Sequence, residues 1–189
     1  CHTRRQRQMC IRDSYYGDIG FKNSTSFYKA VNAVKNGFIR TESDELQYNL
    51  HVLLRYRLER WLFDGDLTAG DLESVWNEEF EKDFGLVIKY PSDGVLQDVH
   101  WSEGLFGYFP TYSLGNVYAG CLFEAMQSQL PDLVQNLNSG NLTEAIGWLA
   151  KSIHKHGSLY SPVDLIQGAC GFDITATCLL YTSPSPRDY

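Results

Sequence analysis

The 189-residue sequence lacks the short motifs that carry several common enzyme chemistries. It contains no H-E-x-x-H pair of zinc ligands, no glycine-rich phosphate loop and no G-x-S-x-G nucleophile turn. His154 and His156 are two positions apart and therefore point in different directions on a helix. We expect them to complement the dipole of a helix end, and we expect no metal ligands within this chain.

Cysteine is scarce, and long apolar runs are missing. Of the five cysteines, Cys1, Cys10 and Cys178 belong to the terminal segments described below, which leaves Cys121 and Cys170. Two cysteines make no disulfide framework, so we expect a reducing, cytoplasmic setting. No apolar run approaches the roughly 20 residues that span a bilayer, and we expect no membrane contact.

The two ends of the sequence look like translations of opposite strands of one short DNA. Residues 9–14 can be encoded by ATGTGTATAAGAGACAG plus one base, and the reverse complement of this DNA encodes residues 178–182. The DNA is similar to the transposase mosaic end used in sequencing libraries. The alternative is a basic nucleic-acid-binding tail and a Ser-Pro linker, but two independent tails are not expected to encode complementary DNA. We therefore expect residues 1–14 and 178–189 to be non-native tails and residues 15–177 to be the natural domain.

The charge balance excludes a general nucleic-acid binder. Five of the 16 Lys and Arg residues but only two of the 23 Asp and Glu residues lie in the terminal segments, so the part between them is more acidic than the whole chain, whose formal net charge is −7. Binding to nucleic acid needs a basic face. A hydrophobic content of 43% is enough for a core, and the length suits one domain or part of a larger one.

The apolar periodicity is helical nearly throughout, and no alternating strand pattern occurs, so we predict an all-α fold. The predicted helices run from Ser24 or Ser26 to Val34, from near Ser43 to Gly65, from Asp66 or Thr68 to Gly85, from about Thr111 to Leu130, from Asn141 or Thr143 to Gly157 and from Ser161 through Ile166. Residues 95–110 are irregular and rich in aromatic residues and glycine.

The long predicted helix after Ser43 carries two stripes. Its apolar stripe is expected to be buried and consists of Leu46, Leu50, Leu53, Leu54, Leu58, Trp61 and Leu62. Its second stripe is spaced by four, three, four and four positions and consists of Asp44, Tyr48, His51, Arg55 and Glu59. Spacing alone favours a solvated stripe in which Arg55 pairs with Glu59, although the stripe could equally line a wet cleft.

A second polar cluster lies in the irregular region. The sequence Gly94-x-x-Gln97-Asp98-x-His100-Trp101 is followed by two tyrosines, Tyr108 and Tyr112. Asp98 could orient the imidazole, and a tyrosine hydroxyl could donate to a developing oxyanion. The alternative is an aromatic loop packed on the core around a satisfied histidine, and the residue types alone do not decide between the two.

These two clusters resemble the signatures of the carboxypeptidase Taq family. Residues 39–55 are similar to its I-R-x-x-A-D-E-x-x-Y-x-x-H-x-x-x-R signature, with Ser43 in place of alanine, and residues 94–101 are similar to its G-x-x-Q-D-x-H-W signature. Residues 106–112, 156–158 and 160–162 follow in the expected order. Two long motifs in the right order make the resemblance specific.

The resemblance implies the C-terminal part of a mostly helical metallocarboxypeptidase with a substrate groove. Members of this family release single residues from peptide C-termini with a zinc-activated water. The resemblance also suggests a homodimer. The zinc ligands are expected upstream of this segment, so we expect the chain alone to bind no zinc and to be an inactive fragment. The alternative is a non-catalytic helical domain that binds peptides or acts as a scaffold.

The resemblance also implies a role for individual residues. His100 and one of Tyr108 or Tyr112 would contact the scissile carbonyl or the oxyanion. Arg40 or Arg55 would receive the substrate carboxylate, because a guanidinium matches it with two hydrogen bonds. His51 and Tyr48 would also line the substrate site. The residues expected to support these side chains are Asp44, Gln97 and Asp98.

Overall fold

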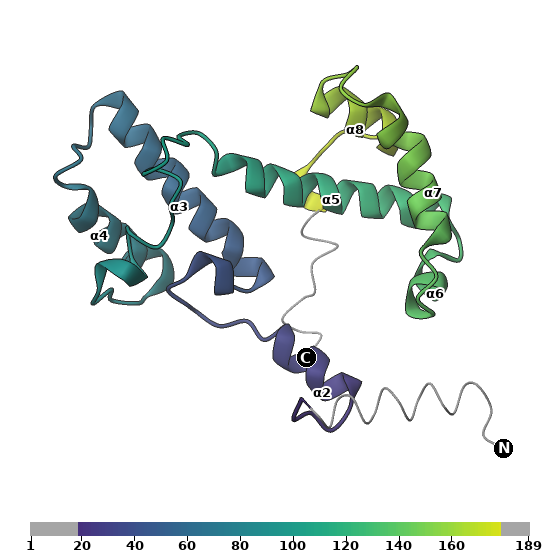
Figure 1. Cartoon of the computed structure of the whole chain (residues 1–189), viewed down its shortest axis with the longest axis horizontal. Helices are drawn as coiled ribbons and strands as arrows, with labels where there is room; N and C mark the ends of the chain where they lie inside the picture. The colour runs from purple at the N-terminus through teal and green to yellow at the C-terminus, as the bar shows by residue number, and fades with distance from the viewer. Residues whose placement is uncertain (1–18, 179–189) are drawn as a thin grey trace.

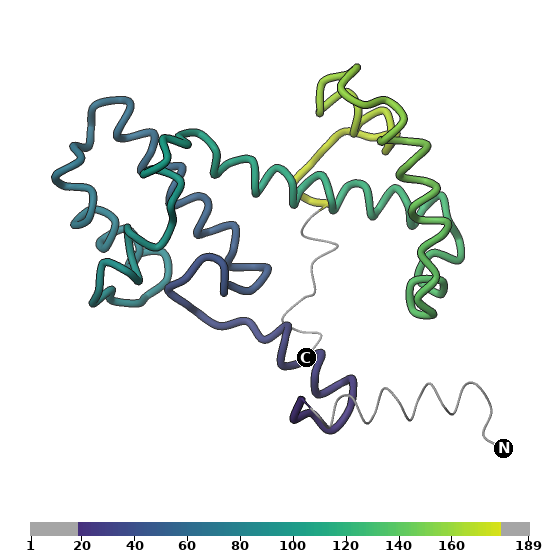
Figure 2. Tube along the Cα trace, in the orientation of Figure 1, coloured from purple at the N-terminus to yellow at the C-terminus, as the bar shows by residue number. Residues whose placement is uncertain are grey.

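The computed structural model describes residues 19–178, and all regular structure within that range is helical, which confirms the predicted all-α fold (Figure 1, Figure 2). Residues 1–14 and 179–189, expected to be non-native, lie outside this range. The α-helices are α2 (Ser24–Val31), α3 (Glu45–Asp64), α4 (Leu72–Phe84), α5 (Pro110–Gln129), α6 (Leu133–Asn138), α7 (Thr143–Ser152) and α8 (Pro162–Cys170). Three 3₁₀ turns, η1 (Arg40–Glu42), η2 (Pro91–Asp93) and η3 (His154–His156), lie between them.

Local side-chain chemistry fixes both ends of α3. The Asp44 carboxylate accepts hydrogen bonds from the backbone N–H groups of Leu46 and Gln47 at 3.0 and 2.9 Å, so Asp44 is the N-cap of the helix predicted to begin near Ser43. At the other end, Gly65 takes a left-handed conformation with φ of 86°, as predicted for a glycine stop. The helix that carries most of the candidate site is therefore well defined at each end.

Some helix boundaries differ from the prediction. Asn23 caps α2 in place of Ser24 or Ser26, and α2 ends at Val31. The helix predicted to begin at Asp66 or Thr68 begins only at Leu72. The delay has a packing reason: Leu67 is buried in the core, and the turn that places it there is followed by a hydrogen bond from the Thr68 hydroxyl to Asp71.

The C-terminal helices show two further differences. Helix α6, which begins two residues after Pro131, was not predicted. Helix α7 ends at Ser152 rather than Gly157, since Ile153 leaves helical geometry with φ of −118°. His154 and His156 therefore lie in a separate 3₁₀ turn and not in the last turn of α7.

Two hydrophobic clusters hold the structure, one at each end of α5 (Figure 1). The first joins α3 and α4 through Leu54, Leu58, Leu67, Trp76, Phe80 and Phe84. The second joins α5, α7 and α8 through Cys121, Ala125, Trp148, Ile166, Cys170 and Cys178. Helix α5 packs against α3 at one end and against α8 further along, so its first turns are held beside α3.

Cys178 is the one described residue of the C-terminal segment that we expect to be non-native. Its side chain is 4% exposed in the second cluster. The non-native origin of residues 1–14 and 178–189 stays a prediction.

The polar stripe of α3 faces inward, contrary to the interpretation that spacing alone favoured. His51 and Arg55 have 0% exposure and Glu59 has 3%, whereas Leu50 and Leu53 of the predicted apolar face are 41% and 51% exposed. Arg55 does not pair with Glu59, because each binds a partner from residues 98–107 instead. The inward direction of this stripe creates the candidate site.

Candidate functional site

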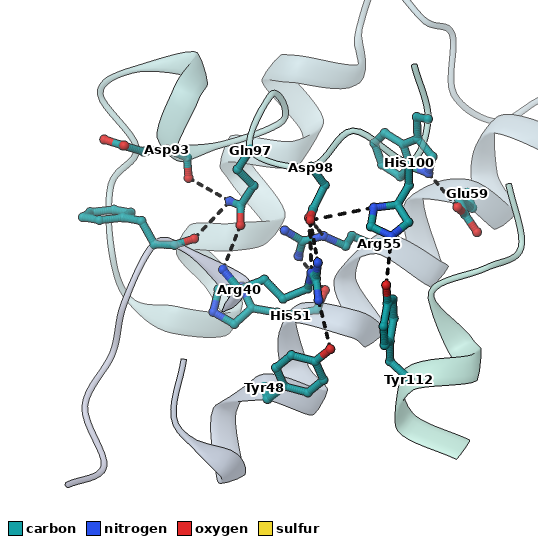
Figure 3. A network of polar contacts seen from close by, with 12 residues as sticks. Arg40, Tyr48, His51, Arg55, Glu59, Asp93, Gln97, Asp98, His100 and Tyr112 are labelled. Carbon is teal, nitrogen blue, oxygen red and sulfur yellow. Dashed lines mark hydrogen bonds and ion pairs between the residues drawn. The ribbon is translucent and has the colours of Figure 1, made fainter. Parts of the chain in front are cut away.

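Two segments that are distant in sequence, η1 with α3 and the loop after η2 with the start of α5, meet in one site (Figure 3). Turn η1 contributes Arg40, the buried stripe of α3 contributes His51 and Arg55, and the loop after η2 contributes Asp98 and its neighbours. The first turn of α5 completes the site with Tyr112. The structure thus brings the two sequence clusters together in one place.

Asp98 lies at the centre of this site between two guanidinium groups. Its Oδ1 is 2.7 Å from Nη2 of Arg40, and its Oδ2 is 2.5 Å from Nε of Arg55. The exposed fractions of the three side chains are 11% for Asp98, 7% for Arg40 and 0% for Arg55. Ion pairs this deeply buried are structurally costly to break, because each charge has lost its water.

The protonation states follow from this arrangement. Burial alone would raise the pKa of Asp98, but the hydrogen bond from Arg40 and the charges of both arginines outweigh it and lower the pKa below its ordinary value. Burial, helped by the charge of Arg40, lowers the pKa of Arg55 to about 10. Burial also works against the charge on Arg40, yet the contacts with Asp98 and Tyr48 raise its pKa. All three groups are therefore charged at neutral pH.

Gln97 and Tyr48 hold Arg40 in place. The Gln97 side-chain oxygen accepts a hydrogen bond from the backbone N–H of Arg40 at 2.9 Å, and its amide donates to the carbonyls of Phe38 and Asp93, each at 3.0 Å. Nη1 of Arg40 donates to the Tyr48 hydroxyl at 2.9 Å. Gln97 thereby links η1 to the loop after η2, and its supporting role in the site stays a prediction.

Asp44 supports the site from further away. Besides capping α3, its Oδ2 accepts a hydrogen bond from the backbone N–H of Lys35 at 3.0 Å. Asp44 therefore fixes the start of α3 and the chain that leads into η1, but it makes no hydrogen bond to Arg40 in the described contacts.

His100 stands beside the paired charges within a group of aromatic rings. Its Nε2 is 3.1 Å from the Tyr112 hydroxyl, and its ring centroid is 4.5 Å from that of Phe109 and 5.6 Å from that of Tyr108. Its Nδ1 is 3.9 Å from Oδ1 of Asp98, which is too far for a hydrogen bond. The expected orientation of His100 by Asp98 is thus replaced by contact with Tyr112, since Asp98 is occupied by the two arginines.

The two tyrosines differ in exposure and in contacts. The ring of Tyr108 is 45% exposed, and its centroid lies 5.4 Å from that of Tyr112. Burial, together with the neighbouring Tyr108 and Tyr48, outweighs the charge of Arg40 and raises the pKa of Tyr112. The Tyr112 hydroxyl is therefore protonated at neutral pH and is available as a hydrogen-bond donor.

His51 and Arg55 have no exposed surface. Direct contact between either side chain and a substrate, which the resemblance implied, is not supported by this geometry. Burial and the charges of Arg55 and Arg40 lower the pKa of His51 to about 4, so its imidazole is neutral at pH 7. Arg40, at 6% exposure, keeps an edge toward solvent.

Two residues of the site were not among the predicted functional residues. Phe109 is 1% exposed, and its ring centroid lies 5.7 Å from Cζ of Arg40 and 5.4 Å from Cζ of Arg55, within the range of a cation–π contact. Glu59 accepts hydrogen bonds from Trp101 and Gly107. The place of Glu59 on the polar stripe, four residues after Arg55, was the available signal for it.

The described residues do not form a metal site. Between residues 19 and 178, no group of three or more His, Cys, Asp or Glu side chains is arranged to hold a metal ion. The donor atoms of the candidate site do not fit zinc either, because Asp98 is bound by two arginines and His51 is enclosed among aromatic rings. We therefore assign no step to a metal in this part of the chain.

A separate hollow lies outside the candidate site. It has a volume of about 710 Å³ and is lined by residues of α5, α7, η3 and α8, including Trp148 and Lys155, and by Tyr160 between η3 and α8. None of the residues of the candidate site lines it.

In the described range, no helix is both long enough and apolar enough to cross a membrane.

Comparison with known proteins agrees with the two sequence clusters. Residues 11–182 match the family described as carboxypeptidase Taq (M32) metallopeptidase. The thermostable carboxypeptidase 1 of Thermus thermophilus is 41% identical over 156 residues, which cover 82% of this chain and 31% of that protein. Carboxypeptidase 1 of Bacillus subtilis is 38% identical over 154 residues, with the same shares of 82% and 31%.

The fold matches as well as the sequence. The structure of Trypanosoma cruzi metallocarboxypeptidase 1 superimposes with a TM-score of 0.83 at 34% identity, and the match covers 92% of this chain and 37% of that one. The chain thus spans about a third of the length of the relatives it matches.

Proposed function

Because the chain belongs to the carboxypeptidase Taq family of metallopeptidases, we propose that the intact protein releases single amino acids from the C-terminus of peptides. The observation that carries this proposal is the arrangement of Arg40 beside His100 and Tyr112. The cation of Arg40, which is 6% exposed and fixed by Asp98, lies next to two hydrogen-bonding groups. This combination suits a substrate with a terminal carboxylate close to the carbonyl that reacts.

Of the two arginines, we assign the substrate carboxylate to Arg40. Its guanidinium lies 5.0 Å from the ring centroid of Tyr112, so a bound carboxylate would lie beside that ring. Arg55 has no exposed atom and keeps Asp98 in place. Asp98 in turn orients Arg40 through its Nε and Nη2, which fixes the plane of the guanidinium.

We assign contact with the reacting carbonyl to His100, with Tyr112 behind it. The hydroxyl of Tyr112 and Nε2 of His100 are 3.1 Å apart, so one of the two is the donor in the free protein. A substrate carbonyl oxygen that gains charge would accept a hydrogen bond from whichever group faces it. Tyr108 and Tyr48 border the same space and are assigned to substrate contact.

Zinc, a homodimeric state and a cytoplasmic location are part of the proposal on the strength of family membership. When bound, zinc would polarise the scissile carbonyl and lower the pKa of a bound water. The described residues offer no ligand set for it, and we propose that the 189-residue chain by itself binds no zinc and has no peptidase activity.

The test is hydrolysis by the protein encoded by the complete gene from which this segment derives. The substrates are an N-blocked dipeptide with a free C-terminal carboxylate and the same dipeptide as its C-terminal amide. We expect release of the last residue from the acid only. Arg40→Lys should lower kcat/KM for the acid by roughly 30-fold, since a charge-assisted hydrogen bond contributes about 1.5–3 kcal/mol.

Arg60→Lys serves as the matched control. Arg60 lies on α3, its side chain is 59% exposed, and its ion-pair partner is Asp64 and not Asp98. Its replacement should therefore leave kcat/KM unchanged. Equal hydrolysis of acid and amide would rule out recognition of a terminal carboxylate. Binding of the acid without any hydrolysis would instead support a non-catalytic peptide-binding domain.

A further inference from the structure

Glu59 is a buried carboxylate on α3 whose partners all lie on one loop. Its side chain is 3% exposed, Oε1 accepts a hydrogen bond from the Trp101 indole at 2.6 Å, and Oε2 accepts one from the backbone N–H of Gly107 at 3.0 Å. We call residues 99–109 the aromatic loop. Within the described range, two hydrogen bonds join this loop to α3, and Glu59 accepts both of them.

The aromatic loop has little regular structure of its own to fix its path. Gly104 and Gly107 take positive φ values of 73° and 74°, conformations that other residues rarely adopt and that glycine enters freely. The first part of the loop is closed by its own backbone hydrogen bonds, such as the one from Leu105 N–H to the His100 carbonyl at 2.8 Å. Such internal bonds shape the turn but do not attach it to the helix.

Glu59 supplies the hydrogen-bonded attachment, at two points of the loop, in addition to the ring contact between Phe63 of α3 and Phe106 of the loop, whose centroids are 5.3 Å apart. One point is Trp101, whose ring also packs edge-on against Trp76 and Phe109, with centroids 5.9 and 6.1 Å apart. The other point is Gly107, just before Tyr108. The carboxylate therefore binds Trp101, which follows His100 directly, and Gly107, which lies two positions before Phe109, the residue whose ring packs on the imidazole.

A buried carboxylate is costly to desolvate, and its cost is offset only when its oxygens are hydrogen-bonded. An apolar residue at position 59 would fill the same helical face without that cost, but it would leave the Trp101 indole and the Gly107 N–H without acceptors. What the carboxylate adds is therefore a pair of directional contacts, not apolar burial.

We propose that Glu59 is a positioning residue, which fixes the aromatic loop on α3 and thereby sets the place of the His100 imidazole. The importance of that place for catalysis rests on the proposed function. The geometric claim does not, because it concerns where a ring lies in the protein with no substrate present.

The experiment is NMR of the 189-residue chain, with Glu59→Leu and Glu59→Gln as variants. In Glu59→Leu, the His100 ring protons should move by more than half of the way toward free-histidine shifts, as they leave the rings of Phe109 and Tyr112. Hydrogen exchange at the Trp101 indole and the Gly107 amide should accelerate at least 10-fold. Glu59→Gln keeps one acceptor oxygen but presents an N–H₂ group to the second donor, so its effects should be intermediate.

Glu78→Gln is the matched control, because Glu78 is 67% exposed and pairs only with Lys82 among the ion pairs described. Its His100 signals should equal those of the unsubstituted chain. If Glu59→Leu fails to fold, Trp101→Phe removes one donor and keeps an aromatic ring, and it should shift the same His100 signals. A lower melting temperature with unchanged His100 signals, in whichever of these variants folds, would refute the proposal and leave Glu59 a purely structural residue.

This readout separates the two claims. Loss of the predicted peptidase activity would not alter the NMR result, and unchanged His100 signals would not alter the carboxypeptidase assignment.

Discussion

Arg55 and Asp98 form a buried ion pair, with Nε and Oδ2 only 2.5 Å apart, although 43 residues separate them in the sequence. The same carboxylate also binds Arg40 through its other oxygen at 2.7 Å. One carboxylate is therefore the shared counter-ion of two guanidinium groups in a place with little access to water. Both the stability of the fold and the geometry of the candidate site therefore depend on the Asp98 carboxylate.

The first prediction concerns Asp98→Asn. The amide keeps the size of the side chain but removes the charge, which leaves two guanidinium groups close together without a counter-ion. Loss of one partner from a buried ion pair costs about 3–5 kcal/mol. Because Asp98 is 11% exposed, we expect a loss of about 3 kcal/mol in the free energy of unfolding, measured by urea denaturation at pH 7.

Asp64→Asn provides the comparison. Asp64 pairs with Arg60 at 3.1 Å, but the two side chains are 49% and 59% exposed, and exposed pairs contribute about 0–1 kcal/mol. Its replacement should therefore change the free energy of unfolding by less than about 0.5 kcal/mol. If Asp98→Asn proved as mild as this control, the ion pairs of Asp98 would not hold the fold together.

The second prediction concerns the pH dependence of stability, and it follows from His51. The imidazole is fully buried, with its ring centroid 4.3 Å from that of Phe84, and its pKa is lowered to about 4. In the unfolded chain a histidine binds a proton below about pH 6.5. Between these values the unfolded state binds more protons than the folded state, so stability falls as the pH falls, by about 3 kcal/mol over the whole window.

His51→Phe tests this directly, because phenylalanine keeps an aromatic ring but cannot titrate. Between pH 6.5 and 4, the free energy of unfolding of the variant should fall less steeply than that of the unsubstituted chain. Above about pH 7 the two curves should run parallel, which serves as the internal control. The contribution of Asp98, whose pKa is lowered from the ordinary aspartate value, is lost progressively below about pH 5, but it is common to both chains and cancels in their difference. Parallel curves throughout the range would contradict the neutral, buried state of His51.

The sequence was sufficient to predict the helical class, the glycine stop at Gly65 and the two clusters that form the site. These features depend on local periodicity and on motif spacing, which a single sequence displays. The direction of the polar stripe of α3 could not be read in the same way. Whether this stripe faces solvent or the interior depends on partners about 40 residues away, such as Asp98 for Arg55. Helical spacing gives no information about those partners.

The role expected for Asp98 shows the same limit. Its closeness to His100 in sequence suggested that it would orient the imidazole, but the carboxylate turns toward Arg40 and Arg55 instead. The charges of both guanidinium groups attract the carboxylate, and it lies 2.7 and 2.5 Å from them but 3.9 Å from the imidazole. The outcome depends on the tertiary contact that brings the loop carrying Asp98 against η1 and α3, and neither motif encodes that contact by itself.

The third prediction compares two glycines. Gly65 ends α3 with φ of 86°, a conformation that costs other residues about 1–2 kcal/mol, so Gly65→Ala should lower the free energy of unfolding by about 1 kcal/mol. Gly147 lies inside α7 with no atom near the position of an added Cβ, so Gly147→Ala should raise it by about 0.5–1 kcal/mol. Urea denaturation of both variants measures the two signs, and equal signs would show that backbone conformation is not the cause.

The fourth prediction concerns His100 in the protein encoded by the complete gene. The Nε2 of the imidazole lies 3.1 Å from the Tyr112 hydroxyl, and the ring packs against Phe109. The guanidinium of Arg40 lies 5.7 Å from the centroid of the same Phe109 ring. If it donates to the carbonyl oxygen as charge develops, the hydrogen bond is strongest in the transition state. His100→Ala should then lower kcat by roughly 100-fold or more, the loss that follows removal of one oxyanion donor.

Metal content and melting temperature, measured on the same preparation, distinguish this role from a structural one. Metal content should stay normal, because His100 belongs to no group of potential metal ligands in the described range. A histidine that only packs against Phe109 predicts a lower melting temperature with little change in kcat for the molecules that remain folded. Near-normal kcat at full metal occupancy would remove His100 from the mechanism and leave Tyr108 and Tyr112 as the groups that contact the carbonyl.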